Sequence, residues 1–138
     1  MILLDTNICI YIIKRKPEEV LRHFQQYHPG DIGISSITLA ELQYGVAKSQ
    51  ARKRNSEALS EFLIPLEILS FDESATQAYG AIRTLLEQQG KTIGAMDLLI
   101  AAHAVSLGAV LVTNNVKEFK RVPDLTIENW VNIKDTEF

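Results

Sequence analysis

The chain begins with MILLDTNICIYIIK, residues 1–14, in which a short apolar run leads directly into a helical pattern. The run Ile2–Leu4 is typical of a buried strand, and Asn7–Lys14 is the first predicted helix. Along the rest of the chain, short apolar runs of strand-forming residues alternate with longer helical patterns. This alternation is typical of a parallel sheet covered by helices, so the sequence predicts an α/β sandwich.

The same two patterns, together with residues that favour helix ends, predict the remaining elements. Further strands are expected at Ile32–Ser35, Glu67–Ser70, Val110–Thr113 and, with the weakest pattern, Leu125–Ile127. Further helices are expected at Glu18–Tyr27, Ser36–Ser49, Arg52–Leu63, Glu73–Gln89 and Ala95–Leu107. The residues that suit helix ends are Pro17, Asp72 as an N-cap, Gly90 and Gly108. No repeat or linker interrupts the pattern, so residues 1–138 are predicted to form a single domain.

The composition narrows the class of protein. With 138 residues, 46% of them hydrophobic, the chain is long enough to bury a core. The net charge of -3 argues against a protein whose whole surface binds nucleic acid. The single cysteine, Cys9, cannot form an internal disulfide, and its apolar surroundings favour a buried core thiol. Without a signal start or a membrane-spanning apolar run, the protein is expected in the cytoplasm and not at a membrane.

Three carboxylates occur where the local pattern does not explain them. Asp5 ends the first predicted strand, and Glu41 and Asp97 each interrupt the apolar stripe of a separate predicted helix. If they met at roughly 5 Å, each pair would repel by about 3 kcal/mol at an effective dielectric near 20. A divalent cation would remove this cost, and oxygen ligands favour Mg²⁺, or Mn²⁺, over zinc. The simpler alternatives are that Asp5 only caps a helix and that Glu41 faces solvent.

Four segments of the chain carry a family resemblance. They are LLDTNI (residues 3–8), SSITLAELQYG (35–45), AMDLLIAAHA (95–104) and LVTNNVKEF (111–119). In this order and at this spacing, they resemble the PIN-domain ribonucleases, and specifically the VapC-type toxins of bacterial toxin–antitoxin pairs. The closing segments 121–125 and 128–130 look like the enteric branch of those toxins. The resemblance therefore extends from end to end of the chain.

The resemblance implies both a fold and a reaction. The fold is a PIN-like three-layer α/β/α sandwich with a central, mostly parallel sheet of four or five strands. The reaction is the hydrolysis of RNA phosphodiesters by an endoribonuclease, in which Asp5, Glu41 and Asp97 hold Mg²⁺ or Mn²⁺ and the ion activates a water. Many family members carry a fourth acid where Asn115 stands, so this amide is also a candidate catalytic residue, acting through a water or a second metal.

Other side chains support more limited hypotheses. The resemblance implies that the hydroxyls of Thr6 and Thr113 orient an acid or a water, whereas Asn7 is expected to cap the first helix. Tyr44 is able to stack on a base, but packing against the core is the favoured interpretation. A basic group either binds the RNA backbone or is only a solvated helix end. Its members are Lys48, Arg52, Lys53 and Arg54.

The resemblance also implies a substrate and partners. The enteric branch implies cleavage of initiator tRNA in its anticodon stem-loop, which would inhibit translation. The family implies an antitoxin, VapB, whose C-terminal segment blocks the active-site groove, a homodimer, and binding to operator DNA only through the antitoxin complex. Two other classes stay open. A phosphoaspartate enzyme is disfavoured because Asn7 stands where a second aspartate is needed, and a non-catalytic RNA- or partner-binding module would engage the acids with arginines of the partner.

Overall fold

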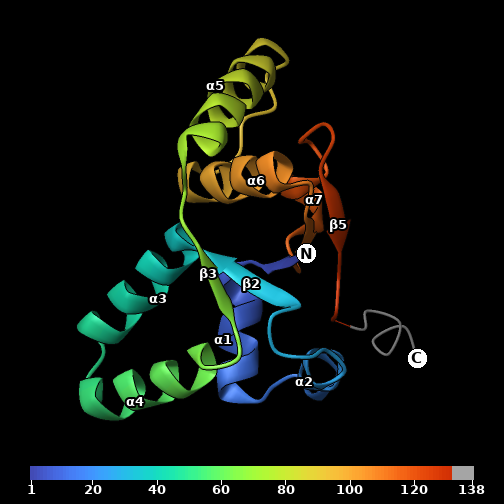
Figure 1. The fold of residues 1–138 in the computed structure, drawn as a ribbon. Coiled ribbons are helices and arrows are strands. Elements are labelled where there is room, and N and C mark those ends of the chain that lie inside the picture. Colours follow the sequence, from blue (N-terminus) through green and yellow to red (C-terminus); the bar gives the residue numbers. More distant parts are fainter. Residues whose placement is uncertain (132–138) are drawn as a thin grey trace.

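A computed structural model describes residues 1–131, and its centre is a five-stranded sheet (Figure 1). The strands are β1 (Ile2–Leu4), β2 (Ile32–Ser35), β3 (Glu67–Leu69), β4 (Val110–Val112) and β5 (Thr126–Glu128). They lie in the order β3-β2-β1-β4-β5, and every neighbouring pair is parallel. The predicted parallel sheet is confirmed, and its weakest predicted strand, β5, is present one residue further along. The prediction of one domain over 1–138 includes residues 132–138, which lie outside the described part.

Helices cover both faces of this sheet. They are α1 (Thr6–Lys14), α2 (Glu18–Gln25), α3 (Ser36–Lys48), α4 (Arg52–Leu63), α5 (Glu73–Gln88), α6 (Ala95–Leu107) and α7 (Val116–Phe119). Helices α1 to α4 lie on one face, below the sheet in Figure 1, and α5 to α7 lie on the other. The predicted three-layer sandwich is therefore confirmed. Helix α7 was not predicted, because four residues are too few to show a helical period.

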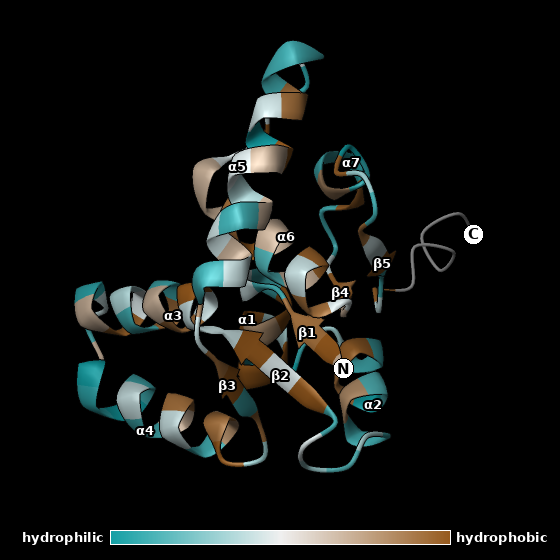
Figure 2. Ribbon diagram, turned by 45° about the horizontal axis from the view of Figure 1, so that its top comes forward, coloured by the Kyte–Doolittle hydropathy of each residue, from teal (hydrophilic) through white to brown (hydrophobic). Residues whose placement is uncertain are grey.

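The alternation of side chains along the central strands separates two hydrophobic cores. Leu3 and Leu111 pack against α5, α6 and α7, whereas Leu4 and Val112 pack against α1 to α4. None of these four side chains is exposed to solvent. Strands that are buried on both faces have continuous apolar sequences, as β1 and β4 do. Figure 2 shows these largely brown strands between helices whose ribbons alternate between teal and brown.

The burial of Cys9 and of Tyr44 can be compared with the prediction for each residue. Cys9 is fully buried, as predicted for a core thiol, and burial raises its pKa well above the ordinary value. The prediction that Tyr44 packs in the core is wrong, since its side chain is 65% exposed. Within residues 1–131, no helix is long and apolar enough to cross a membrane.

Candidate functional site

The carboxyl ends of β1 and β4 place two polar side chains next to each other. The backbone N–H of Asp5 donates to the carbonyl of Val112 at 3.0 Å, which extends the β1–β4 pairing by one residue. Thr113, which follows β4, donates its hydroxyl to the Asp5 carboxylate. This edge of the sheet is where open parallel sheets bind ligands.

Asp5 has a second task at the start of α1. Its Oδ1 accepts a hydrogen bond from the backbone N–H of Ile8 at 2.9 Å, so Asp5 is the N-cap of this helix. The prediction that Asn7 caps α1 is wrong, because the chain already turns into the helix at Thr6 and Asn7 lies within the first turn. Asp5 therefore does cap the helix, as the simpler alternative expected.

The three predicted acids influence one another electrostatically. The pKa of Asp5 is raised from 3.8 to about 6, first by burial and then, against hydrogen bonds from Thr113 and Ile8, by the charges of Asp97 and Glu41. The pKa of Asp97 is also raised, by burial and by the charges of Glu118 and Glu41. Asp5, which follows β1, thus lies within electrostatic range of acids on α3 and α6 that are far from it in the sequence.

Hydrogen bonds orient Glu41 and the helix that carries it. The hydroxyl of Thr6, in the first turn of α1, donates to Oε1 of Glu41. Ser35 caps α3 by accepting from the N–H of Ile37 at 3.0 Å, and its Oγ also lies 2.8 Å from Nδ1 of His103 on α6. Both Ser35 and His103 are buried. A buried polar contact therefore joins the start of the Glu41 helix to the Asp97 helix.

Asn115 contacts two carboxylates at once. Its Nδ2 donates to Oδ2 of Asp97 at 3.4 Å and to Oε2 of Glu118 at 2.7 Å. The bond from Asn115 is the main reason why the pKa of Glu118 lies below its ordinary value, and the N–H of Gly94 also contributes by donating to Glu118 at 3.4 Å. The amide thus holds Asp97 and Glu118 beside each other.

The sequence analysis assigned no role to Glu118. This residue lies on the short helix α7, which shows no periodic signal. The available clue was its position three residues after Asn115, which places the two side chains on the same side of one helical turn.

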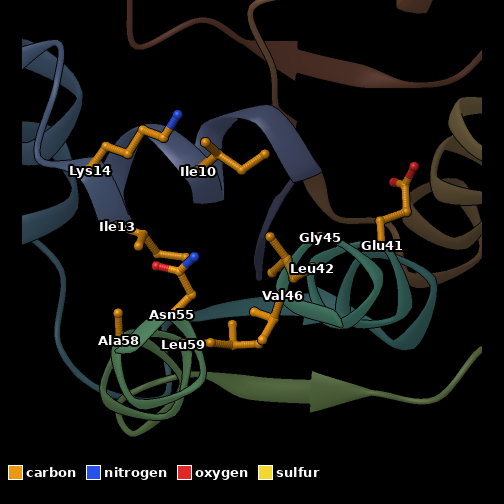
Figure 3. A pocket seen from close by; sticks show the side chains of 10 residues that line it. All are labelled: Ile10, Ile13, Lys14, Glu41, Leu42, Gly45, Val46, Asn55, Ala58 and Leu59. Atoms are coloured by element: carbon orange, nitrogen blue, oxygen red, sulfur yellow. The ribbon is translucent and has the colours of Figure 1, made fainter. Parts of the chain in front are cut away.

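An apolar groove that includes Glu41 lies between α1, α3 and α4. Its volume is about 280 Å³, and its lining residues are Ile10, Ile13, Lys14, Glu41, Leu42, Gly45, Val46, Asn55, Ala58 and Leu59. Figure 3 shows Glu41 at one end of this groove, with its carboxylate pointing away from Val46 and Leu59. The four residues of the basic group are exposed near the same region, at the end of α3 and the start of α4.

Comparisons with known proteins agree with this arrangement. The PIN domain model matches residues 2–125. The chain belongs to the PIN-domain family. It is 51% identical over 129 residues to Ribonuclease VapC2 from Rickettsia felis, covering 93% of this chain and 96% of the relative. It is 44% identical over 128 residues to the tRNA(fMet)-specific endonuclease VapC from Shigella flexneri, with the same two coverages of 93% and 96%.

Solved structures are similar to this PIN domain along nearly all of its length. The complex VapBC2 from Rickettsia felis, bound to a DNA fragment from its promoter, contains a chain that matches with a TM-score of 0.89 and 50% identity, over 95% of this chain and all of the other. The DNA-bound VapBC from Salmonella typhimurium matches with a TM-score of 0.89 and 45% identity, over 94% and 98%. The predicted resemblance to VapC-type proteins is confirmed.

The donor atoms of the site fit a hard divalent cation. Asp5, Glu41 and Asp97 offer only carboxylate oxygens, the ligands that Mg²⁺ and Mn²⁺ prefer. Their mutual repulsion helps to raise the pKa of Asp5 and of Asp97, and a bound cation would relieve that repulsion. Within residues 1–131, however, no three acidic, histidine or cysteine side chains are already gathered in a way that would hold an ion.

Proposed function

We propose that this PIN domain is a metal-dependent endoribonuclease of the VapC type, the toxin of a toxin–antitoxin pair. The observation that carries the proposal is the electrostatic coupling of Asp5, Glu41 and Asp97 at the carboxyl edge of the sheet. The names of the relatives support it, since proteins 44–51% identical to this chain are called ribonucleases or endonucleases. Hydrolysis of an RNA phosphodiester is a reaction that these acids could support with a bound metal, and it is the activity that the names of the relatives describe.

The residues of the site would divide the work among them. Asp5, Glu41 and Asp97 would hold Mg²⁺, or Mn²⁺, which when bound lowers the pKa of a water and offsets negative charge on the phosphate. Thr6 orients Glu41 and Thr113 orients Asp5 through the hydroxyl contacts described above.

Asp97 receives support from its helix and from a neighbour. It lies in the first turn of α6, where the helix dipole favours a carboxylate. The amide of Asn115 donates to it and so restricts the direction in which this carboxylate points. For Asn115, the role supported by these hydrogen bonds is the positioning of Asp97.

Initiator tRNA is the substrate that we propose. Two relatives, from Shigella flexneri and Salmonella typhimurium, are named tRNA(fMet)-specific endonucleases and are 44% and 45% identical to this chain. The protein as a whole carries a net charge of -3, so the phosphate backbone would have to be bound by a local patch of positive charge. The exposed basic group on α3 and α4 would be that patch. Cleavage in the anticodon stem-loop would inhibit translation.

An assay with purified, antitoxin-free protein tests this function. Initiator tRNA, elongator tRNAs and an unrelated structured RNA are incubated with Mg²⁺, with Mn²⁺ or with EDTA, and the product ends are mapped. We expect cleavage of initiator tRNA with either metal, none in EDTA, and none by an Asp97→Asn preparation purified in parallel. If the folded wild-type protein binds Mg²⁺ but cuts none of these RNAs, the nuclease proposal is wrong and a partner-binding module becomes the better interpretation.

We also propose that the chain is restrained by a VapB antitoxin. Neighbouring structures are VapBC complexes, and two of them are bound to DNA, which supports an antitoxin partner and binding to operator DNA through the complex. The apolar groove beside Glu41 is suited to an apolar segment of that partner, which would then cover the acids. A homodimer of the toxin is part of the same proposal.

The groove makes a testable prediction. Ala58→Glu places a charge among apolar lining residues, so we expect it to weaken antitoxin binding by at least about 2 kcal/mol, or roughly thirtyfold in Kd. Titration calorimetry measures this, and RNA cleavage without antitoxin should be unchanged. Ala81→Glu, the same substitution on an exposed position of α5, is the control and should bind antitoxin normally. Equal affinities for the two variants would place the antitoxin elsewhere.

A further inference from the structure

The ring of Tyr44 lies exposed beside the proposed active site. Among the tyrosine, phenylalanine and tryptophan side chains of residues 1–131, it is the exposed one, at 65%. A single exposed apolar side chain is ordinary on a protein surface. The position of this ring relative to its neighbours on α3 is what suggests a role.

Glu41, Tyr44 and Lys48 follow one another along one side of α3. Their spacings of three and four residues place them on the same helix face. At 1.5 Å per residue, the Cα of Tyr44 lies about 4.5 Å along the helix axis from that of Glu41, and the Cα of Lys48 lies about 10.5 Å from it. The line therefore runs from an acid of the site to an aromatic ring and then to a cation.

The cation is in direct contact with the ring. Nζ of Lys48 lies 4.9 Å from the centroid of Tyr44, within the range of a cation–π interaction. This contact holds the Lys48 charge over one face of the ring, so a stacked base would use the other face and its phosphate would lie within reach of this charge. It also helps to order an otherwise free side chain.

The basic group continues the same line onto α4. Asn55 donates its Nδ2 to Oγ of Ser49 at 3.0 Å, and Ser49 donates its hydroxyl to the carbonyl of Val46 at 2.8 Å. These bonds fix the short connection between the two helices. As a result, the basic start of α4 follows directly after Lys48, and positive charge extends away from the acids.

We propose that Tyr44 is the stacking platform for an unpaired RNA base next to the cleaved phosphate, with Lys48 contacting the backbone. The proposal rests on the proposed nuclease function and specifies which RNA the site accepts. A base can lie on the ring only if it has left its own stack, so the platform selects single-stranded loops over duplex. Every base has an aromatic face, so the platform itself would not read sequence.

The antitoxin is a weaker candidate for the same ring. Tyr44 is not among the residues that line the apolar groove, where we place the antitoxin segment. Lys48 over the ring gives this surface a positive charge, which suits a phosphate backbone. Loss of antitoxin binding instead of RNA binding on substitution of Tyr44 would therefore overturn the proposal.

The test compares Tyr44→Leu with Tyr44→Phe, each in an Asp97→Asn background so that RNA is not cut. Binding of a labelled stem-loop RNA is measured by fluorescence anisotropy in Mg²⁺. Tyr44→Leu removes the aromatic face, so we expect its Kd to rise between about fivefold and a hundredfold, and Tyr44→Phe keeps the face, so its Kd should be unchanged. A blunt duplex of the same length should bind all three proteins equally.

The controls separate this proposal from the nuclease function. Leu107→Ala removes another exposed side chain, 40% accessible, at the end of α6 opposite Asp97, and should leave RNA binding unchanged. Wild-type cleavage is assayed in parallel. If wild-type protein cleaves RNA but Tyr44→Leu binds the stem-loop as tightly as the parent, the stacking proposal alone fails. If wild-type protein neither binds nor cleaves the stem-loop, both proposals fail.

Discussion

Asp5→Asn is expected to abolish RNA cleavage and, at the same time, to make the metal-free protein more stable. The loss of activity should be at least about a hundredfold, the scale of losing one group that stabilises charge in the transition state. The gain in stability follows from the burial of Asp5, which is 4% exposed and lies near two other acids. Function and stability therefore make opposite demands on this position.

The direction of the pH dependence follows from the pKa of Asp5. Folding raises this pKa from 3.8 to about 6, so between these values the folded state binds more protons than the unfolded state. The contribution of Asp5 is most favourable below pH 3.8 and is lost as the pH rises through about 6. At 1.36 kcal/mol per unit, ionised Asp5 then costs roughly 3 kcal/mol.

Asparagine avoids this cost and keeps the helix cap. It carries no charge, and its side-chain oxygen is as good an N-cap as aspartate for the N–H of Ile8. We therefore expect the free energy of unfolding of Asp5→Asn to exceed that of wild type by roughly 1 to 3 kcal/mol at pH 7.5, with a smaller difference near pH 4. Urea unfolding in EDTA at the two pH values measures this.

A matched control and a metal titration complete the experiment. Asp72 caps α5 by accepting from the N–H of Ala75 at 3.1 Å but is exposed, so Asp72→Asn should change stability little at either pH. Adding Mg²⁺ should stabilise wild type and not Asp5→Asn, because ligand binding stabilises only the protein that binds it. If the Asp5→Asn protein is less stable than wild type at pH 7.5 in EDTA, ionised Asp5 does not destabilise the folded protein as proposed.

The fold was predictable because most of its elements have a clear apolar run or a helical pattern in the sequence. The apolar runs of β1 and β4, the helical spacing along α5 and the apolar sequence of α6 come from side chains that fill the two cores. The prediction missed the one helix of the described residues that is too short to show such a pattern. Helix α7 has four residues, and Glu118, the acid that it carries beside Asp97, was missed with it.

The details of the site depend on contacts that sequence patterns do not encode. The position at which α1 begins is fixed by pairing of Asp5 with β4, which moves the cap from Asn7 to Asp5. Tyr44 has a large aromatic side chain of the kind often found in cores. It is exposed because α3 packs through Thr38 and Leu42 instead. The parallel topology predicted that the acids lie at one edge of the sheet. Their effect on one another's pKa depends on how α1, α3 and α6 pack, which the sequence pattern does not specify.

Asn115→Asp should destabilise the metal-free protein and make it more dependent on Mg²⁺. Asparagine at this position donates to both Asp97 and Glu118, whereas an aspartate has no donor and adds a third negative charge. Losing hydrogen bonds to charged groups and adding repulsion should cost about 2 kcal/mol once solvent screening is allowed for. The pKa of Glu118, which the Asn115 bond lowers, should rise in the variant.

Unfolding by urea in EDTA and in Mg²⁺ measures both effects. In EDTA the variant should be less stable than wild type, and the difference should shrink or reverse as Mg²⁺ is added, because the extra carboxylate attracts the cation. Asn114→Asp is the control, since Asn114 is exposed and uses only its oxygen, which accepts from Asn129 at 3.3 Å. It should behave like wild type. If Asn115→Asp is as stable as wild type in EDTA, the amide is not what allows Asp97 and Glu118 to lie close together. Screening of the two charges by solvent would then be the simpler explanation.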